Sequence, residues 1–264
     1  MTTLRRNALT PLLCTDAHRK AALTRALDVD AACGADEALV EPAGIPGRPA
    51  RPVLVAHTAL KTRSVHSIEG RAALIHALAH IELNAIDLAL DLCWRFPGLP
   101  EAFYRDWLAV AREEALHFEL LRDHLRTLGS EYGDLPAHNA LWEMAERTKH
   151  DLLARIALVP RTLEARGLDA SPPIRAKLVA AGDHRAGEIL DVILHDEIGH
   201  VAVGNRWYRQ LCDERGLEPV ATYAALATKY RAPQPRGPFN LDARRAAGFT
   251  DQELVALGET ETRG

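Results

Sequence analysis

The chain contains few cysteines and no closely spaced pair of them. Cys14, Cys33, Cys93 and Cys212 lie far apart in the 264 residues, and no Cys-x-x-Cys is present. A disulfide-rich secreted domain or a zinc knuckle needs such pairs, so the sequence fits neither class. The spacing favours free, buried thiols in a reducing compartment, and we expect a cytoplasmic protein.

An excess of charge of one sign is also missing. The 32 basic and 36 acidic residues give a formal net charge of −4, which provides no general attraction for nucleic acid or an anionic membrane. No uninterrupted apolar run approaches the ~20 residues that a membrane span needs. The stretch after Arg5 and Arg6 is short and broken by Pro11, unlike a secretory signal. We therefore expect no membrane partner.

Strand patterns are nearly absent, because the β-favouring residues are scattered without sustained alternation. Helical patterns are present instead, and 47% of the residues are hydrophobic, enough for a full core. Prolines and glycines divide the middle of the chain into four long helical segments, 64–94, 100–129, 137–166 with a kink at Pro160, and 174–215. Segment 167–173 is expected to separate the last two. Four long helices with short breaks predict an all-α four-helix bundle.

The bundle is expected to carry an addition at each end. We place an N-terminal helical extension with a Pro-rich connection at 1–58, the bundle at 59–216, and a C-terminal tail that packs on the bundle at 217–264.

Short elements are predicted in both additions. Thr10 and Pro11 are expected to cap and begin one N-terminal helix, and residues 16–27 to form another. The tail is expected to contain three features: a short helix near 221–230, a Pro-rich crossing at 233–238, and a capping box at Thr250–Glu253.

Two segments share one pattern, an acidic residue followed by Glu-x-x-His, and their sequences are REEALH and HDEIGH. Residues i and i+3 lie on one face of an α-helix, so the Glu and His of each segment can converge. Stepping by 3.6 residues places Glu114 and His117 on one apolar stripe, and Glu197 and His200 on another. Both pairs are therefore expected to point inward.

Glu82 is the single carboxylate in the middle of a third apolar stripe, on the first long helix. A buried, ionised carboxylate is so costly that it must be paired, protonated or bound to metal. With the two Glu-x-x-His glutamates, three such carboxylates require cations.

The fourth carboxylate is assigned to Glu164 by spacing. The first Glu-x-x-His glutamate follows Glu82 by 32 residues, and the second follows Glu164 by 33. The chain thus contains two helix pairs of one design, each with a Glu on its first helix and Glu-x-x-His on its second. Together these residues are the ligand set of di-iron carboxylate bundles. Pro160 disturbs the helical phase here, so Glu143 or Glu146 remains an alternative.

Five segments carry a resemblance to a known family: HALAHIELNAID at 76–87, REEALHFELLRDH at 112–124, VPRTLEARGLD at 159–169, ILHDEIGHVAVGNRWY at 193–208 and PFNLDARRAAGF at 238–249. The sequence resembles the ferritin-like superfamily, and more closely a bacterial family of uncharacterised ferritin-like proteins, domain of unknown function 455. It is more distantly similar to bacterial tRNA-modifying hydroxylases of that superfamily. The resemblance implies a ferritin-like bundle with a di-metal site whose ligands are Glu82, Glu114, His117, Glu164, Glu197 and His200.

Four carboxylates and two imidazoles without a thiolate suit iron or manganese better than structural zinc. We predict two iron ions, with manganese as the alternative. Glu114 and Glu197 are the expected bridging ligands, and Glu82 and Glu164 the terminal ones.

Residues near the ligands receive other roles. Glu113 and Asp196 are expected to accept a hydrogen bond from the ligand histidine of the partner helix. His80 and His195 each precede a ligand by two residues, which turns them away from the metals. His124 is expected to take a supporting or core position.

The leading functional hypothesis is an O2-dependent oxidoreductase, a hydroxylase or oxidase of an unidentified small molecule with a possible electron-donating reductase. A ferroxidase or iron-handling protein is one alternative, although the additions at both ends fit a storage cage poorly and favour a monomer or small homo-oligomer. A tRNA-directed hydroxylase is another, and a non-enzymatic bundle with a vestigial site is the last. Four arginines form a basic edge for tRNA or are solvated: Arg231, Arg236, Arg244 and Arg245.

Overall fold

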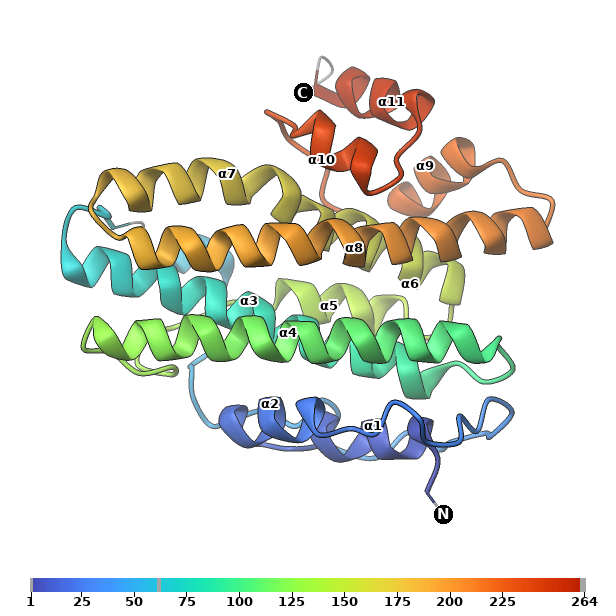
Figure 1. The fold of residues 1–264 in the computed structure, drawn as a ribbon. Coiled ribbons are helices and arrows are strands. Elements are labelled where there is room, and N and C mark those ends of the chain that lie inside the picture. Colours follow the sequence, from blue (N-terminus) through green and yellow to red (C-terminus); the bar gives the residue numbers. More distant parts are fainter. Residues whose placement is uncertain (1, 61–62, 262–264) are drawn as a thin grey trace. The chain divides into compact units, whose positions relative to one another are not determined.

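The computed structural model describes residues 2–60 and 63–261, with side chains up to residue 258. Residues 262–264 of the predicted tail lie outside this part. The described residues form helices and one isolated bridge between Leu54 and Ala137, and no strand, which confirms the all-α prediction. The elements are α1 Leu4–Leu12, α2 Ala17–Arg25, η1 His57–Ala59, α3 Ile68–Arg95, α4 Glu101–Thr127, α5 Ala140–Arg147, α6 Leu152–Leu158, η2 Val159–Glu164, α7 Ala165–Ala180, α8 His184–Glu214, α9 Pro219–Lys229, α10 Leu241–Ala246 and α11 Asp251–Glu261 (Figure 1).

The chain divides into two compact units. Unit 1 comprises Met1–Trp142 and Lys177–Ile189, and unit 2 comprises Glu143–Ala176 and Leu190–Gly264. The long helix α8 therefore contributes its first turns to unit 1 and the remainder to unit 2.

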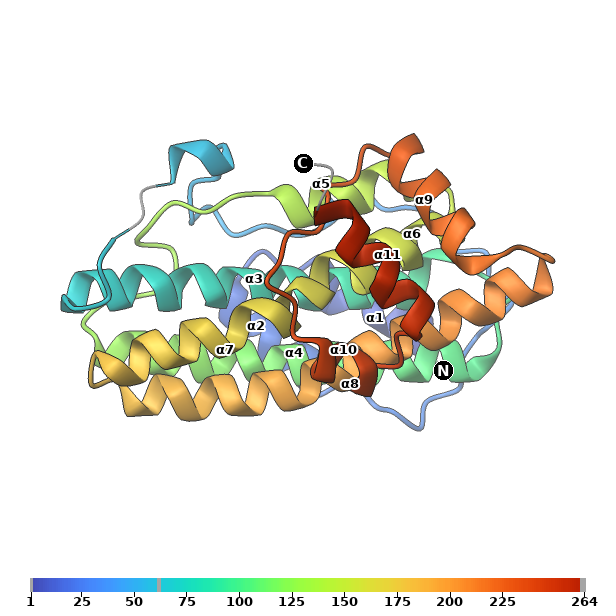
Figure 2. The ribbon, with the colours of Figure 1, turned by 90° about the horizontal axis from the view of Figure 1, so that it is seen from above.

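Unit 1 is built on the hairpin of α3 and α4, which run side by side in Figures 1 and 2. Ser67 caps α3 by accepting a hydrogen bond from the Gly70 N–H at 3.0 Å, and the chain leaves the helix at Phe96. The turn into α4 uses Gly98 at φ +77°, a conformation that favours glycine. These boundaries match the predicted ones within a few residues.

The N-terminal helices α1 and α2 pack on this hairpin. Lys20 of α2 is fully buried, forms an ion pair with Asp87 of α3 and donates to the Gly47 carbonyl at 2.8 Å. Arg5 of α1 donates to the Cys93 and Trp94 carbonyls, which belong to the last turn of α3. Buried, hydrogen-bonded cations therefore fasten the N-terminal segment to the hairpin.

The predicted start of the first N-terminal helix at Pro11 is wrong. The helix begins at Leu4, capped by Thr3, and Pro11 lies in its last turn. A proline there removes only one intrahelical hydrogen bond. Leu4 and Leu12 are at most 2% exposed, and their burial offsets that loss. The second predicted helix agrees with α2.

The third long helix departs most from prediction. It is divided into α5 and α6, followed by the π-helical turn η2 at Pro160 and then α7, and it continues through Pro172 and Pro173 to Ala180. The expected end at 166 is therefore wrong. Pro172 has no N–H for the Leu168 carbonyl, and the Asn240 side chain donates to that carbonyl instead at 3.2 Å.

The expected start of the last long helix at 174 is also wrong, because α8 begins at His184. Gly182 turns the chain at φ +85°, and the Asp183 carboxylate accepts from the Ala186 N–H at 3.0 Å in the first turn. The helix ends before Gly216, as predicted.

Unit 2 has its own apolar core, and its members come from α7, α8, α10, α11 and the turn before α11: Ala165, Leu168, Val201, Ala243, Ala247, Phe249, Leu254 and Leu257. The predicted capping box is confirmed. The Thr250 N–H donates to Glu253 Oε2 at 2.8 Å, and the Glu253 N–H donates to Thr250 Oγ1 at 3.3 Å. The predicted tail helix corresponds to α9.

Among the described helices, only α3 has the length and composition to span a membrane. In its most apolar stretch 72% of the residues are buried within the structure. The same helix buries the acidic residues Glu82, Asp87 and Asp91, a pattern that suits the core helix of a globular protein.

Candidate metal centre

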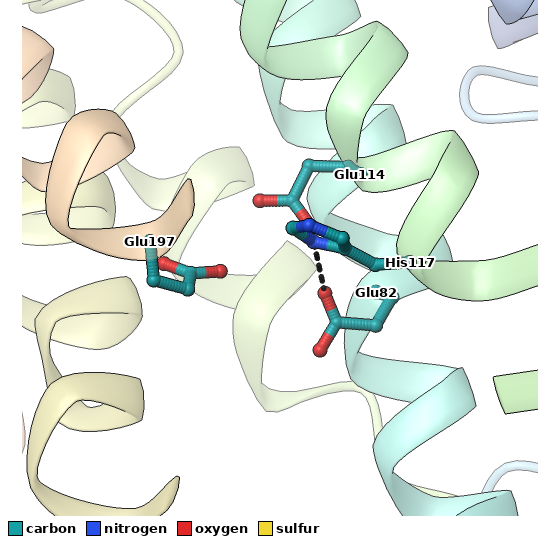
Figure 3. A group of neighbouring side chains, drawn as sticks. All are labelled: Glu82, Glu114, His117 and Glu197. Atoms are coloured by element: carbon teal, nitrogen blue, oxygen red, sulfur yellow. Dashed lines mark hydrogen bonds and ion pairs between the residues drawn. The ribbon is translucent and has the colours of Figure 1, made fainter. Parts of the chain in front are cut away.

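Three buried side chains converge between α3 and α4 in unit 1. Glu82 lies midway along α3, and Glu114 and His117 lie one turn apart on α4. One possible ligand atom from each lies within 4.8 Å of the others, and Figure 3 shows the three side chains pointing toward one another. The Nδ1 atom of His117 is 3.4 Å from an oxygen of Glu82 and 3.4 Å from an oxygen of Glu114. The predicted convergence of these residues is thus present.

Helical phase explains why these polar groups point inward. Ile75, Ala79 and Ile86 of α3 are fully buried, and Glu82 lies on the same stripe of that helix. Glu82 itself is 5% exposed, whereas Glu114 and His117 are fully buried. The apolar stripes therefore carry the carboxylates and the imidazole away from water.

The electrostatics of this group show that it needs positive charge. Burial, followed by the charge of Glu114, raises the pKa of Glu82 well above its usual value. Burial alone would lower the pKa of His117, but hydrogen bonds and charges from Glu114 and Glu82 outweigh it and raise that pKa to about 11. A proton held here supplies part of the cationic charge that the two carboxylates require.

The donor atoms fit a metal ion. Glu82 Oε2 has no hydrogen-bond partner of normal geometry among the described residues and only the His117 ring nitrogen at 3.4 Å. Carboxylate oxygens and an imidazole nitrogen are ligands of iron, manganese and zinc. This buried group of glutamates and a histidine could therefore hold a metal ion.

The second Glu-x-x-His pair lies on α8, in the part that belongs to unit 2. Glu197 and His200 are 6% and 1% exposed, and His200 Nδ1 is 3.8 Å from Glu197 Oε1. The two side chains share one face of the helix, as the spacing predicts.

Glu164 ends η2 and is half-buried. Gly167 follows it by one turn, and a Cβ atom added to Gly167 would lie 4.0 Å from the Glu197 carboxyl carbon. This face of α7 therefore approaches Glu197. The alternatives Glu143 and Glu146 are exposed residues of α5.

The neighbouring candidates take varied positions. Glu113 is exposed and Asp196 is half-buried. His80 is turned from the cluster and lies 2.7 Å from the Tyr132 hydroxyl through Nδ1. His124 Nε2 is 3.0 Å from Asp183, which supports a core position, and His195 is exposed.

The predicted basic edge is incomplete. Arg231 and Arg236 are exposed, but the Arg244 side chain is 3% exposed and donates to both oxygens of Asp169 at 2.6 and 3.0 Å. Arg245 lies 3.4 Å from Asp251. Sequence reasoning also missed a cavity in unit 2, because its walls come from three separated segments with no common motif.

The fold and this cluster define an all-helical protein with a buried carboxylate–histidine group suited to a metal. The chain belongs to the family described as protein of unknown function (DUF455), whose pattern matches residues 13–255. An uncharacterized protein of Haemophilus influenzae strain Rd is 51% identical over 220 residues, which cover 81% of this chain and 76% of that protein. No solved structure matches the chain significantly.

Proposed function

We propose that this protein is a ferritin-like, non-haem di-iron carboxylate oxidoreductase that uses O2 to hydroxylate or oxidise a small substrate. The buried group of Glu82, Glu114 and His117 on the α3–α4 hairpin carries the proposal. In this proposal Glu164, Glu197 and His200 complete the site from unit 2.

The repeated pattern supports this completion. Glu197 and His200 have the spacing and burial of Glu114 and His117, and Glu164 takes the place along the chain that Glu82 takes in the first half. Four carboxylates carry four negative charges, which two divalent cations neutralise. Without such ions, burial of the ionised carboxylates of Glu82, Glu114 and Glu197 would cost several kcal/mol each.

The ligand types support iron or manganese over structural zinc. A zinc site of the structural kind is usually tetrahedral and rich in thiolate, whereas this set has four carboxylates, two imidazoles and no cysteine. A bound ferrous pair would supply the electrons that reduce O2. Glu114 and Glu197 are the proposed bridging ligands.

The protein's own residues have separate tasks in this function. The buried side chains of Ile75, Ala79 and Ile86 exclude water from the carboxylates. Glu113 and Asp196 are proposed to orient the ligand histidines. The four cysteines are unpaired thiols, in keeping with a cytoplasmic location, where a reductase is the proposed electron donor.

Anaerobic titration with Fe(II) tests the site. We expect about two ions per chain, in line with the di-metal ligand set. Glu114→Ala and Glu197→Ala should each remove at least one ion. Glu143→Ala is the matched control, because Glu143 is exposed, and it should bind as much iron as the unmodified protein. Fewer than about one ion per chain, or unchanged binding in both ligand variants, overturns the assignment.

Mixing the loaded protein with O2 tests the reaction. A single rapid oxidation of the bound iron, without continued turnover of added Fe(II), is expected of an oxygenase. Continued turnover of added Fe(II) would instead establish a ferroxidase. Filter binding to tRNA separates a tRNA-directed hydroxylase from an enzyme of small molecules, and size-exclusion chromatography tests the proposed monomer or small homo-oligomer.

A further inference from the structure

Unit 2 contains a partly open cavity of about 490 Å³. Its walls come from η2, α9, the segment that follows α9, and α10–α11, and Figure 2 shows α9, α10 and α11 near one another. Ligand sites in proteins are commonly clefts of ~300–1,000 Å³ with mainly apolar walls and a few polar groups. The apolar lining includes Val220, Ala224, Ala227, Phe249, Ala256 and Leu257.

A buried guanidinium contributes to this cavity. Arg161 of η2 is 3% exposed at its side chain, forms an ion pair with Glu253 and donates through Nε to Asn205 Oδ1 at 2.8 Å. The central carbon of the Arg161 guanidinium, Cζ, lies 4.6 Å from the ring centre of Tyr208 and 5.1 Å from that of Tyr223. The remaining nitrogen, Nη1, donates to no acceptor within the described part of the chain, although Arg161 lines the cavity.

The hydroxyl groups of the wall belong to Thr162, Tyr223 and Thr228, and all three donate within the protein. Thr228 Oγ1 donates to the Ala224 carbonyl at 3.0 Å. Thr162 Oγ1 donates to the Ala157 carbonyl at 2.7 Å, so the Tyr223 hydroxyl, 3.0 Å away, must donate to Thr162. The side-chain donors that remain for a ligand are guanidinium groups and the Gln234 amide. The cavity is therefore suited to a molecule that accepts hydrogen bonds.

The charged residues of the cavity wall determine whether an anionic or a cationic ligand is favoured. Arg161 is neutralised by Glu253, and Arg244 by Asp169. Arg231 lines the cavity, and no carboxylate pairs with it among the described residues. Within the described part of the chain one unpaired positive charge remains, which favours a monoanion.

The backbone at Arg231 is also unusual. Arg231 has φ +51° and follows the last turn of α9, where its N–H donates to the Thr228 carbonyl at 3.2 Å and the Ala232 N–H donates to the Ala227 carbonyl at 2.9 Å. This is the Schellman position that glycine usually occupies. Residues with such strained backbone conformations are frequent at ligand-binding sites. Here the strained residue is an arginine that lines the cavity.

We infer that this cavity binds a small monoanion with an apolar body, such as an aliphatic or aromatic carboxylate. The carboxylate binds Arg231 and Arg161 Nη1, and the apolar body lies against Ala227 and Phe249. The ligand thereby contacts η2, the same short helix that ends at Glu164. The inference does not rest on the metal, because the cavity and its charges lie within unit 2.

Calorimetric titration of the metal-free protein with octanoate, 3-phenylpropionate and neutral octanamide tests this. We expect saturable binding of at least one carboxylate, in the ~millimolar range typical of such small ligands, and weaker binding of octanamide. Stronger octanoate binding indicates an aliphatic ligand, and stronger phenylpropionate binding an aromatic one. No saturable binding of either carboxylate overturns the inference.

Variants locate the ligand. Ala227→Phe on α9 and Ala256→Phe on α11 each place a large side chain in the cavity lining and should each weaken carboxylate binding about 10-fold or more. Ala225→Phe is the matched control, because Ala225 is exposed on α9 and does not line the cavity. Carboxylate affinity that neither cavity variant lowers would place binding elsewhere and refute the site.

Arg231→Gly tests the charge without endangering the fold, because glycine suits φ +51°. It should weaken carboxylate binding about three-fold, the size of an exposed ion pair, and leave octanamide binding unchanged. Arg231→Lys should retain most of the affinity. Equal binding of octanoate by the Gly variant and the unmodified protein refutes the anion selectivity. Because these titrations need no metal, their failure is distinct from failure of the di-iron proposal.

Discussion

Replacing Glu82 by glutamine should leave the metal-free protein nearly as stable and remove most of the stabilisation that a metal provides. The charges around Glu82 explain the first effect. Its possible ligand atom lies within 4.8 Å of that of Glu114, a repulsion of about 3 kcal/mol at an effective dielectric constant near 20. Protonated His117 at 3.4 Å attracts the same carboxylate by about 5 kcal/mol on that scale. The two terms oppose each other, and relief of desolvation further reduces the net cost of removing the charge.

The second effect follows from mass action. At a metal concentration 100-fold above the dissociation constant, binding stabilises the folded protein by about 2.7 kcal/mol. For a chain of 264 residues that corresponds to a rise in Tm of about 5 °C. If the lost ligand weakens affinity about 100-fold, the remaining stabilisation is about 0.4 kcal/mol and the rise about 1 °C.

Thermal unfolding with and without Mn²⁺ measures both effects, and this ion avoids oxidation during the scan. Glu69→Gln is the matched control, because Glu69 is exposed in the first turn of the same helix and should keep the full metal response. The reasoning is refuted if Glu82→Gln retains the same Mn²⁺-induced rise in Tm as the unmodified protein.

Three further predictions concern stability. Lys20→Met leaves Asp87 buried without its partner and should lower the free energy of unfolding in urea by about 3–5 kcal/mol. The control Lys149→Met removes the partly exposed pair with Glu146 and should cost less than about 1 kcal/mol. Equal costs would contradict the conclusion that Lys20 fastens the N-terminal segment to the hairpin. Burial lowers the pKa of His76 from 6.5 to about 4. The stability that depends on a neutral, buried imidazole is therefore fully present above pH 6.5 and is lost as the pH falls toward 4. Between pH 7 and pH 5 the unmodified protein should lose about 2 kcal/mol more than His76→Gln, and parallel pH profiles would show that His76 does not titrate this way. Arg231→Gly should raise the free energy of unfolding by about 1 kcal/mol through relief of the left-handed backbone; a lower Tm would contradict that strain.

The candidate centre was predictable to the extent that it depends on local geometry. Glu114 and His117 share a face because of their spacing on one helix. Glu82 meets them because the turn around Gly98 is short and both helices have unbroken apolar stripes. No such argument was available for Glu164, because the helical phase after Pro160 depends on the π-helical turn.

The sequence by itself determined the helical content, the hairpin of α3 and α4 and the inward direction of its polar groups, because these follow from helical periodicity and nearby turn residues. Only the tertiary structure decided whether a proline would end a helix. Pro11 is tolerated in α1 because its neighbours are buried, and Pro172 is tolerated in α7 because Asn240, 68 residues later, donates to the carbonyl that the proline leaves unpaired. The charge of the unit 2 cavity was decided in the same way. Partners distant in sequence neutralise Arg161 and Arg244, whereas Arg231 has no carboxylate partner among the residues whose side chains the structure describes.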